Sequence, residues 1–250
     1  MGLEEELVEV YRKAACELPE DVLAELKKRA GDRKIDTILD NCEIAKAESK
    51  PICQDTGTPV WYVKKPTGKS EDEIRTAIES ATKRAVEEVP LRANSVCPVT
   101  GQNFGLMPFI HFEEHEKDLI QFDLLLKGGG SENIGQTYFV KEMEFSAVKN
   151  YVKDAVEKAG DRGCPPYVLG VCVGGSRDIV SYYSKRMLRR KLDDVNKNPV
   201  AAEMEKELVE EFDNVMGVKI GITNRHPASY FVDVCFSCWA LRRGRLEWKL

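Results

Sequence analysis

The order of helix-like and strand-like patterns limits the fold of this chain more than any other feature. Apolar residues at spacings of three and four predict helices at residues 3–16, 21–29, 35–47, 70–89, 144–159, 177–190 and 198–215. Short apolar runs predict strands at residues 108–112, 119–126, 167–173 and 230–239. Because these elements follow no regular βαβ rhythm, we predict an α+β (mixed α/β) fold, with helices around a mixed or antiparallel sheet, and not a Rossmann fold.

The domain organisation follows from length and from the absence of internal punctuation. The 250 residues are 42% hydrophobic, which is enough to bury one large core. The sequence contains no internal repeat, low-complexity tract or flexible linker. We therefore expect a single domain over residues 1–250, with a helical N-terminal segment at about residues 1–48.

Charge and hydropathy limit the kinds of molecule that this protein is expected to bind. The formal net charge of -5 and pI near 5.5 argue against nucleic acid but permit an anionic small molecule bound by a few focused arginines. The longest apolar stretch, residues 167–173, is far shorter than the roughly 20 residues that cross a bilayer, so we expect no membrane span. The acidic start of the sequence differs from a signal peptide, and we expect a cytoplasmic protein.

The sharpest local signal is PICQDTGTPVW at residues 51–61. A thiol, an amide, a carboxylate and a hydroxyl precede a glycine turn, and a turn lets such groups and backbone N–H groups converge on one point. An ordinary Asx-type turn with a buried cysteine is an equally good interpretation at this stage.

A second signal is KGGGSEN at residues 127–133. Successive glycines allow a close approach to a ligand and can direct N–H groups at an anion. The spacing matches neither a Walker loop nor a dinucleotide fingerprint, which disfavours a nucleotide site. A tight loop at the exit of a strand explains the glycines as well.

A third signal is the number of cysteines, which is eight in a chain without an export signal. In a reducing compartment they are expected to be thiols, thiolates or metal ligands. Three motifs carry them among glycines and prolines: GCPPY at 163–167, GVCVGGS at 170–176 and CFSC at 235–238. A zinc site or a redox pair is an open alternative, although a single C-x-x-C would need further ligands from far along the chain.

The sequence resembles the α subunit of class I fumarate hydratases and L-tartrate dehydratases. The resemblance is carried by four motifs in this order: CQDTG, KGGGSEN, CPP…GG and HPAS…CWALRR. The resemblance covers about residues 38–243. It implies a [4Fe-4S] cluster held by three thiolates, with one iron open as a Lewis acid. The matching ligands are Cys53, Cys164 and Cys238.

The remaining cysteines are weaker candidates for ligands of the cluster. Cys172 is a rival to Cys164, and Cys235 is a local rival to Cys238. We expect the others to be packing residues: Cys16, Cys42 and Cys97.

The resemblance also implies a set of substrate-binding residues: Gln54, Asp55, Arg92, the Gly130 backbone and His226. Arg92 offers a guanidinium fork that suits a carboxylate. Asp55 is the candidate for proton transfer at the substrate hydroxyl. His226 is expected to orient a carboxylate or share that proton.

The same resemblance implies a small dicarboxylate substrate and a second protein region. Fumarate/malate is our first expectation, L-tartrate the second and mesaconate the third. Because the sequence ends soon after its last cysteine motif, we expect a separate β subunit that supplies a threonine base and further carboxylate-binding residues, in an α2β2 assembly.

A non-enzymatic interpretation stays open at this point. The cysteines also suit a metal-sensing or redox-sensing module, or a relative that has lost catalysis. A sensor, however, has no use for Gln54, Asp55, Arg92 and His226 around an open iron.

Overall fold

The structure is a computed structural model that describes residues 2–142 and 144–249. It divides into two compact units that alternate along the chain. Unit 1 consists of Met1–Glu20, Arg29–Gly128 and Arg242–Leu250, and unit 2 of Asp21–Lys28 and Gly129–Leu241. No helix in the described part of the chain is long and apolar enough to cross a membrane.

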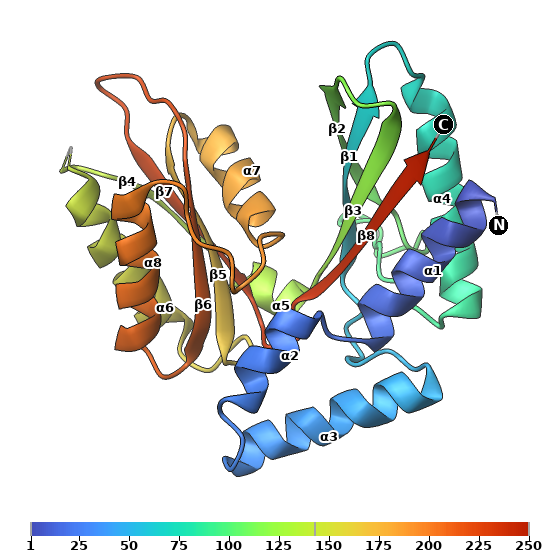
Figure 1. The fold of residues 1–250 in the computed structure, drawn as a ribbon, viewed down its shortest axis with the longest axis horizontal. Coiled ribbons are helices and arrows are strands. Elements are labelled where there is room, and N and C mark those ends of the chain that lie inside the picture. The colour runs from blue at the N-terminus through green and yellow to red at the C-terminus, as the bar shows by residue number, and fades with distance from the viewer. Residues whose placement is uncertain (1, 143, 250) are drawn as a thin grey trace. The chain divides into compact units, whose positions relative to one another are not determined.

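Unit 1 is built on a four-stranded mixed sheet in the order β2-β1-β3-β8. The strands are β1 (Thr58–Pro66), β2 (Phe109–His115), β3 (Leu119–Lys127) and β8 (Arg242–Lys249). β1 runs parallel to β2 and antiparallel to β3, which also pairs antiparallel with β8. The helices of this unit are α1 (Leu3–Cys16), α3 (Arg33–Glu48) and α4 (Glu71–Glu88). In Figure 1, α1 and α4 pack against each other beside the sheet.

A buried aromatic cluster joins the helices of unit 1 to its sheet. The Trp61 ring meets the Tyr11 ring edge to face at 5.4 Å, and its Nε1 donates a hydrogen bond of 3.0 Å to the Tyr11 hydroxyl. That hydroxyl lies 2.6 Å from Thr82 Oγ1 on α4. Since every polar atom of this cluster has a partner, burial of the two large rings stabilises unit 1 without an unsatisfied donor.

Unit 2 is an α/β/α sandwich around a mixed sheet in the order β4-β7-β5-β6. The strands are β4 (Gln136–Phe139), β5 (Tyr167–Gly174), β6 (Val215–Ile222) and β7 (Phe231–Ser237). Its helices are α2 (Glu20–Lys27), α5 (Gly129–Glu132), α6 (Val148–Ala159), α7 (Arg177–Met187) and α8 (Pro199–Glu211), with a 3-10 turn at Phe145–Ala147. Alternate residues of β5, such as Leu169 and Val171, join a core with α6 and α8, while α7 covers the opposite face (Figure 1).

The predicted mixed α/β fold is confirmed, since both sheets contain parallel and antiparallel pairs. Four strands were not predicted: β1, β4, β6 and β8. β1 follows directly on the CQDTG motif and contains Pro59, and β8 consists largely of charged residues. β4 has only four residues, and β6 follows closely on the end of α8. The helix predicted at 198–215 is wrong at its end, because α8 stops at Glu211 and the next strand begins at Val215. The single domain over residues 1–250 stays a prediction.

The contact between α7 and β5 gives a test of packing in unit 2. A Cβ added at Gly170 would lie 2.1 Å from the main-chain oxygen of Ser184, so Gly170→Ala should push α7 away and lower the free energy of unfolding by about 1–3 kcal/mol or more. Gly221→Ala is the matched control on β6, because its Cβ would meet only the flexible Met187 side chain, at 3.0 Å. Urea unfolding of both variants measures the difference, and equal losses would contradict the close approach of α7.

Candidate functional site

In unit 1, the loop between α3 and β1 carries the first motif on a fixed backbone. The Ile52 N–H donates to the Ala15 carbonyl at 2.9 Å, and the Ile52 carbonyl accepts from Asn41 Nδ2 at 3.0 Å. Ile52 itself is buried, whereas the next residue, Cys53, is half-buried. The thiol is therefore presented from a backbone that α1 and α3 hold in place.

A tight turn follows at Asp55 to Gly57. The Asp55 carboxylate accepts a hydrogen bond of 3.0 Å from the Gly57 N–H. Gly57 has a φ of +83°, and a Cβ there would lie 2.9 Å from the carbonyl carbon of Leu126. The residue must therefore be glycine both for its conformation and for its closeness to β3. The Asx-type turn considered from the sequence is present, but the cysteine beside it is not buried.

Arg92 lies beside this turn. Its N–H donates to the buried Thr56 hydroxyl at 2.9 Å, and Asn94 Nδ2 lies 3.5 Å from the Gly57 carbonyl. The side chains of Gln54 and Arg92 are exposed. Unit 1 thus brings together four of the predicted site residues: Cys53, Gln54, Asp55 and Arg92.

A buried arginine from β8 supports the same turn. Arg242, only 1% exposed, donates from Nη1 to the main-chain oxygen of Asp55 at 2.7 Å. A charge-assisted hydrogen bond of this kind is among the stronger ones. This role was not predicted, because Arg242 stands in a largely charged segment of the sequence that resembles a surface strand.

Two further cysteines lie together at one end of the unit 2 sheet. Cys164 lies three residues before β5 and is exposed, with a φ of +60°. Cys238 directly follows β7 and is half-buried. Antiparallel pairing of Val168 with Ser237 places both at the same sheet end. The N–H of Trp239 donates to the Cys164 carbonyl at 3.3 Å, which joins the two loops directly.

Gly130 lies near the same end. It belongs to the short helix α5, which packs against β7, and the following strand β4 starts with Gln136 opposite Val234. The predicted glycine-rich loop is therefore one helical turn. Gly130 is exposed, and a Cβ there would meet nothing within 4 Å.

His226 lies at the opposite end of this sheet. β5 ends at Gly174, β6 ends at Ile222 and β7 starts at Phe231, so the connection that carries His226 leaves from the far end (Figure 1). Between Phe231 and Ser237, β7 rises about 20 Å at the usual 3.3 Å per residue. The structure thus separates His226 from Cys164 and Cys238 by far more than a side chain can reach.

The exposed His226 ring has a defined hydrogen bond. Its Nδ1 accepts from the Ala228 N–H at 3.1 Å, which leaves the proton of the neutral ring on Nε2. The glycine pair of GVCVGGS makes room for this loop, because a Cβ on Gly174 would lie 2.3 Å from the Thr223 oxygen. Nε2–H is therefore available as a donor to an anion.

The rival cysteines are in apolar surroundings. Burial raises the pKa of the Cys42 thiol to about 11 and that of Cys172 to about 12, so both are protonated at neutral pH. Cys16 and Cys235 are also buried. Cys97 differs from expectation: it is half-exposed, and hydrogen bonds with Thr100 hold the pKa of its thiol below the usual range.

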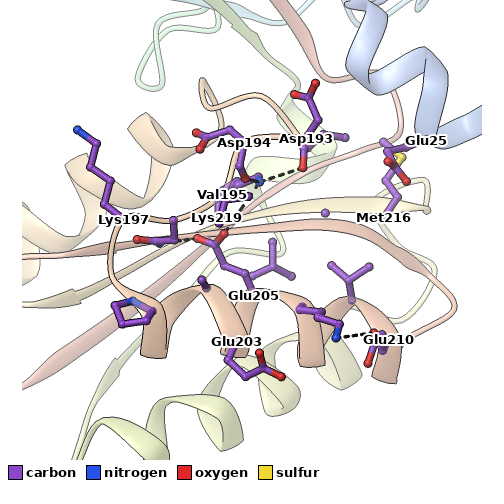
Figure 2. Close-up of a pocket in the computed structure, with 18 residues that line it drawn as sticks. Glu25, Asp193, Asp194, Val195, Lys197, Glu203, Glu205, Glu210, Met216 and Lys219 are labelled. Atoms are coloured by element: carbon purple, nitrogen blue, oxygen red, sulfur yellow. Dashed lines mark hydrogen bonds and ion pairs between the residues drawn. The ribbon is translucent and has the colours of Figure 1, made fainter.

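A cavity of about 660 Å³ in unit 2 is lined by none of these residues (Figure 2). Lys219 Nζ donates there to the Leu192 and Asp194 carbonyls at 3.0 and 2.6 Å. Glu205 accepts from Arg190 at 2.7 Å and from the Ile220 N–H at 2.6 Å. These bonds hold the segment after α7 against β6, so we interpret this network as structural. Within either unit, no three described His, Cys, Asp or Glu side chains form a metal site.

Comparison with known proteins gives a consistent picture over the whole chain. The family model described as Fumarate hydratase (Fumerase) matches residues 4–247. A putative L(+)-tartrate dehydratase subunit alpha of Methanocaldococcus jannaschii is 35% identical, with 100% of this chain and 99% of that protein covered. A putative fumarate hydratase class I of Geobacillus stearothermophilus is 33% identical over 96% of this chain, which spans only 54% of that protein. The L(+)-tartrate dehydratase subunit alpha of Escherichia coli K12 is 29% identical, covering 92% and 85%.

The turn that carries Asp55 gives the test of this half of the site. Gly57→Ala should lower the free energy of unfolding by about 1–3 kcal/mol more than Gly68→Ala, because both residues have a left-handed φ but only Gly57 faces backbone atoms within 3.0 Å. Denaturant unfolding of the two variants measures the difference. Equal effects would show that the approach of the turn to β3 does not constrain it.

Proposed function

Because the chain belongs to the Fumarate hydratase (Fumerase) family, we propose that it is the α subunit of an iron–sulfur-dependent hydro-lyase acting on a small dicarboxylate. The observation that carries the proposal is the selective exposure of the cysteines in the family motifs. Cys53, Cys164 and Cys238 are accessible on loops next to well-held backbone, while the rivals Cys172 and Cys235 are buried.

We propose that these three residues hold a [4Fe-4S] cluster. Thiolates are the ligands that such clusters take, and the contact of Trp239 with Cys164 keeps two of the ligand loops together. When bound, the cluster supplies a Lewis acid that makes a substrate hydroxyl a better leaving group. Cys172 fits the group poorly, because burial keeps its thiol protonated.

The other residues of unit 1 suit the two ends of a hydroxy dicarboxylate. The exposed Arg92 guanidinium can pair with a carboxylate through two parallel hydrogen bonds. Asp55 is held on both sides, by the Gly57 N–H at its side chain and by Arg242 at its main chain. A carboxylate fixed in this way can accept and return the proton of the substrate hydroxyl. Gln54 and the Gly130 backbone offer further hydrogen bonds to the substrate.

Fumarate/malate is our first choice of substrate, L-tartrate the second and mesaconate the third. Two of the relatives are named as alpha subunits, and the Geobacillus relative extends well beyond the part matched here. We therefore propose that a separate β subunit contributes the base, a threonine hydroxyl, and further carboxylate-binding residues, in an α2β2 assembly.

His226 takes a different place in this proposal. It lies at the far end of the sheet that carries Cys164 and Cys238, so it cannot serve the cluster of its own chain. An α2β2 assembly contains two copies of this chain. We propose that the Nε2–H of His226 donates to the substrate carboxylate in the site of the other copy.

The first experiment is anaerobic purification with iron and acid-labile sulfide analysis. We expect about four irons and four sulfides per chain, and turnover of malate or L-tartrate after co-expression with a β subunit. Alkylation should then be slow at Cys53, Cys164 and Cys238 in the loaded protein and fast after iron is removed. Cys172 is the internal control, since it is buried and should react slowly in both states. Zinc, or equal alkylation of Cys53, Cys164 and Cys238 with and without iron, would overturn the proposal.

A mixing experiment tests the place of His226. Asp55→Asn and His226→Ala should each abolish turnover in a uniform complex. When the two variants are unfolded, mixed in equal amounts and reassembled, a site with both native residues forms in half of the dimers. We expect about a quarter of the native activity to return. If His226 acted within its own chain, every site would lack one residue and no activity would return.

A further inference from the structure

Residues 93–112 form the longest stretch of the chain without Asp, Glu, Lys or Arg. In a sequence that is 32% charged, 20 residues would carry about six such side chains, because charged residues dominate ordinary protein surfaces. This segment, ANSVCPVTGQNFGLMPFIHF, instead contains three phenylalanines and a methionine. Depletion of charge with enrichment of Phe and Met is the composition of the core of a protein–protein interface.

The same segment is exposed rather than buried. Val99 is 90% exposed, Phe104 55%, Met107 56% and Phe109 63%. Together with Val96, these make five of the eleven large apolar side chains exposed in the described part of the chain. Such a concentration marks a contact surface, whereas isolated exposed apolar residues are ordinary.

The segment has a defined shape. Residues Ser95 and Gly105 pair through main-chain bonds of 2.8–2.9 Å that include Phe104, and Cys97 donates to Gln102 at 2.8 Å. Asn103 Nδ2 closes the base of this hairpin on the Ala93 carbonyl at 2.8 Å. The hairpin leads into β2, the edge strand of the unit 1 sheet (Figure 1). A preformed surface of this kind loses little entropy when a partner binds.

Its position relates it to the candidate site. The hairpin begins three residues after Arg92, whose N–H is fixed on Thr56 beside Asp55. Whatever covers residues 93–112 therefore comes close to the substrate-binding residues of unit 1.

The end of unit 2 that carries His226 also exposes apolar side chains, as residues 93–112 do. Exposed apolar side chains gather there on three elements: Phe139 at the end of β4, Ile222 at the end of β6 and Ile179 in the first turn of α7. Phe139 stacks edge to face on Phe231 at 5.7 Å, and Ile179 lies against Gly175. This end therefore presents apolar side chains beside the His226 loop, together with the exposed charges of Arg177, Asp178 and Arg225.

We propose that residues 93–112 of one copy dock on the His226 end of unit 2 of a second copy. The proposal rests on the proposed function, which requires His226 to reach the site of another copy, and it names the surface that brings it there. With a two-fold axis, each chain gives its hairpin and receives the hairpin of the other, so the contact occurs twice and the dimer closes. Burial of the exposed apolar side chains on both surfaces supplies the binding free energy.

The test uses charge on this surface in the full, anaerobically purified chain. Val99→Glu and Phe104→Glu should weaken self-association about tenfold or more each, as expected for a charge placed in an apolar interface. Ile44→Glu is the matched control, because Ile44 is 57% exposed on α3 and belongs to neither surface. Sedimentation velocity over a range of concentrations gives the dissociation constants, and circular dichroism checks that each variant is folded.

The outcomes separate this proposal from the proposed function. If the unmodified chain is a monomer, or if both hairpin variants associate like Ile44→Glu, the docking proposal is overturned whatever the activity. If the variants dissociate but the unmodified complex turns over no dicarboxylate, the docking surface stands and the assigned activity fails. If the hairpin variants still dimerise but no longer bind a co-expressed β subunit, residues 93–112 bind the β subunit and not a second copy, and the docking proposal is overturned.

Discussion

The antiparallel pairing of β5 with β7 determines which residues of unit 2 lie close together. Because the start of β5 lies beside the end of β7, the loops with Cys164 and Cys238 meet at one sheet end. The same pairing sends the connection from β6 to β7 to the other end, with His226 on it. A packed sheet cannot bend enough to bring its two ends together, so His226 stays apart from these two cysteines within one chain.

In unit 1, the position of the Asp55 turn depends on its close contact with the backbone of β3, and not on the direction of a strand. Gly57 lets the motif turn lie against β3, and the buried Arg242 bonds to the main chain of Asp55 from β8. Burying a guanidinium is costly, and its Nε has no hydrogen-bond partner among the described residues. A fold tolerates such a cost where a backbone position matters, which is consistent with a turn that orients a reacting carboxylate.

The sequence was informative where local patterns decide the structure. The helix at Leu3–Cys16 and the buried strand at Tyr167–Gly174 follow from apolar periodicity and from an apolar run. β8 was not predicted, because RRGRLEWK forms a strand through its pairing with β3 and not through its composition. Motif residues close in sequence, such as Asp55 and Gly57, were grouped correctly. The separation of His226 from Cys238, only twelve residues apart, depends on the length and direction of β7, which a motif does not reveal.

Burial also distinguishes the cysteines that suit the proposed cluster from those that do not. All eight thiols have the same intrinsic chemistry, but a ligand must lose its proton, and the apolar surroundings of Cys42 and Cys172 oppose this by raising their pKa. Loops at the end of a strand leave a thiol accessible while the strand fixes its backbone. Cys164 and Cys238 have this arrangement, and Cys53 reaches it through the anchored Ile52. Position relative to the sheet, more than spacing in the sequence, thus decides which thiols are accessible.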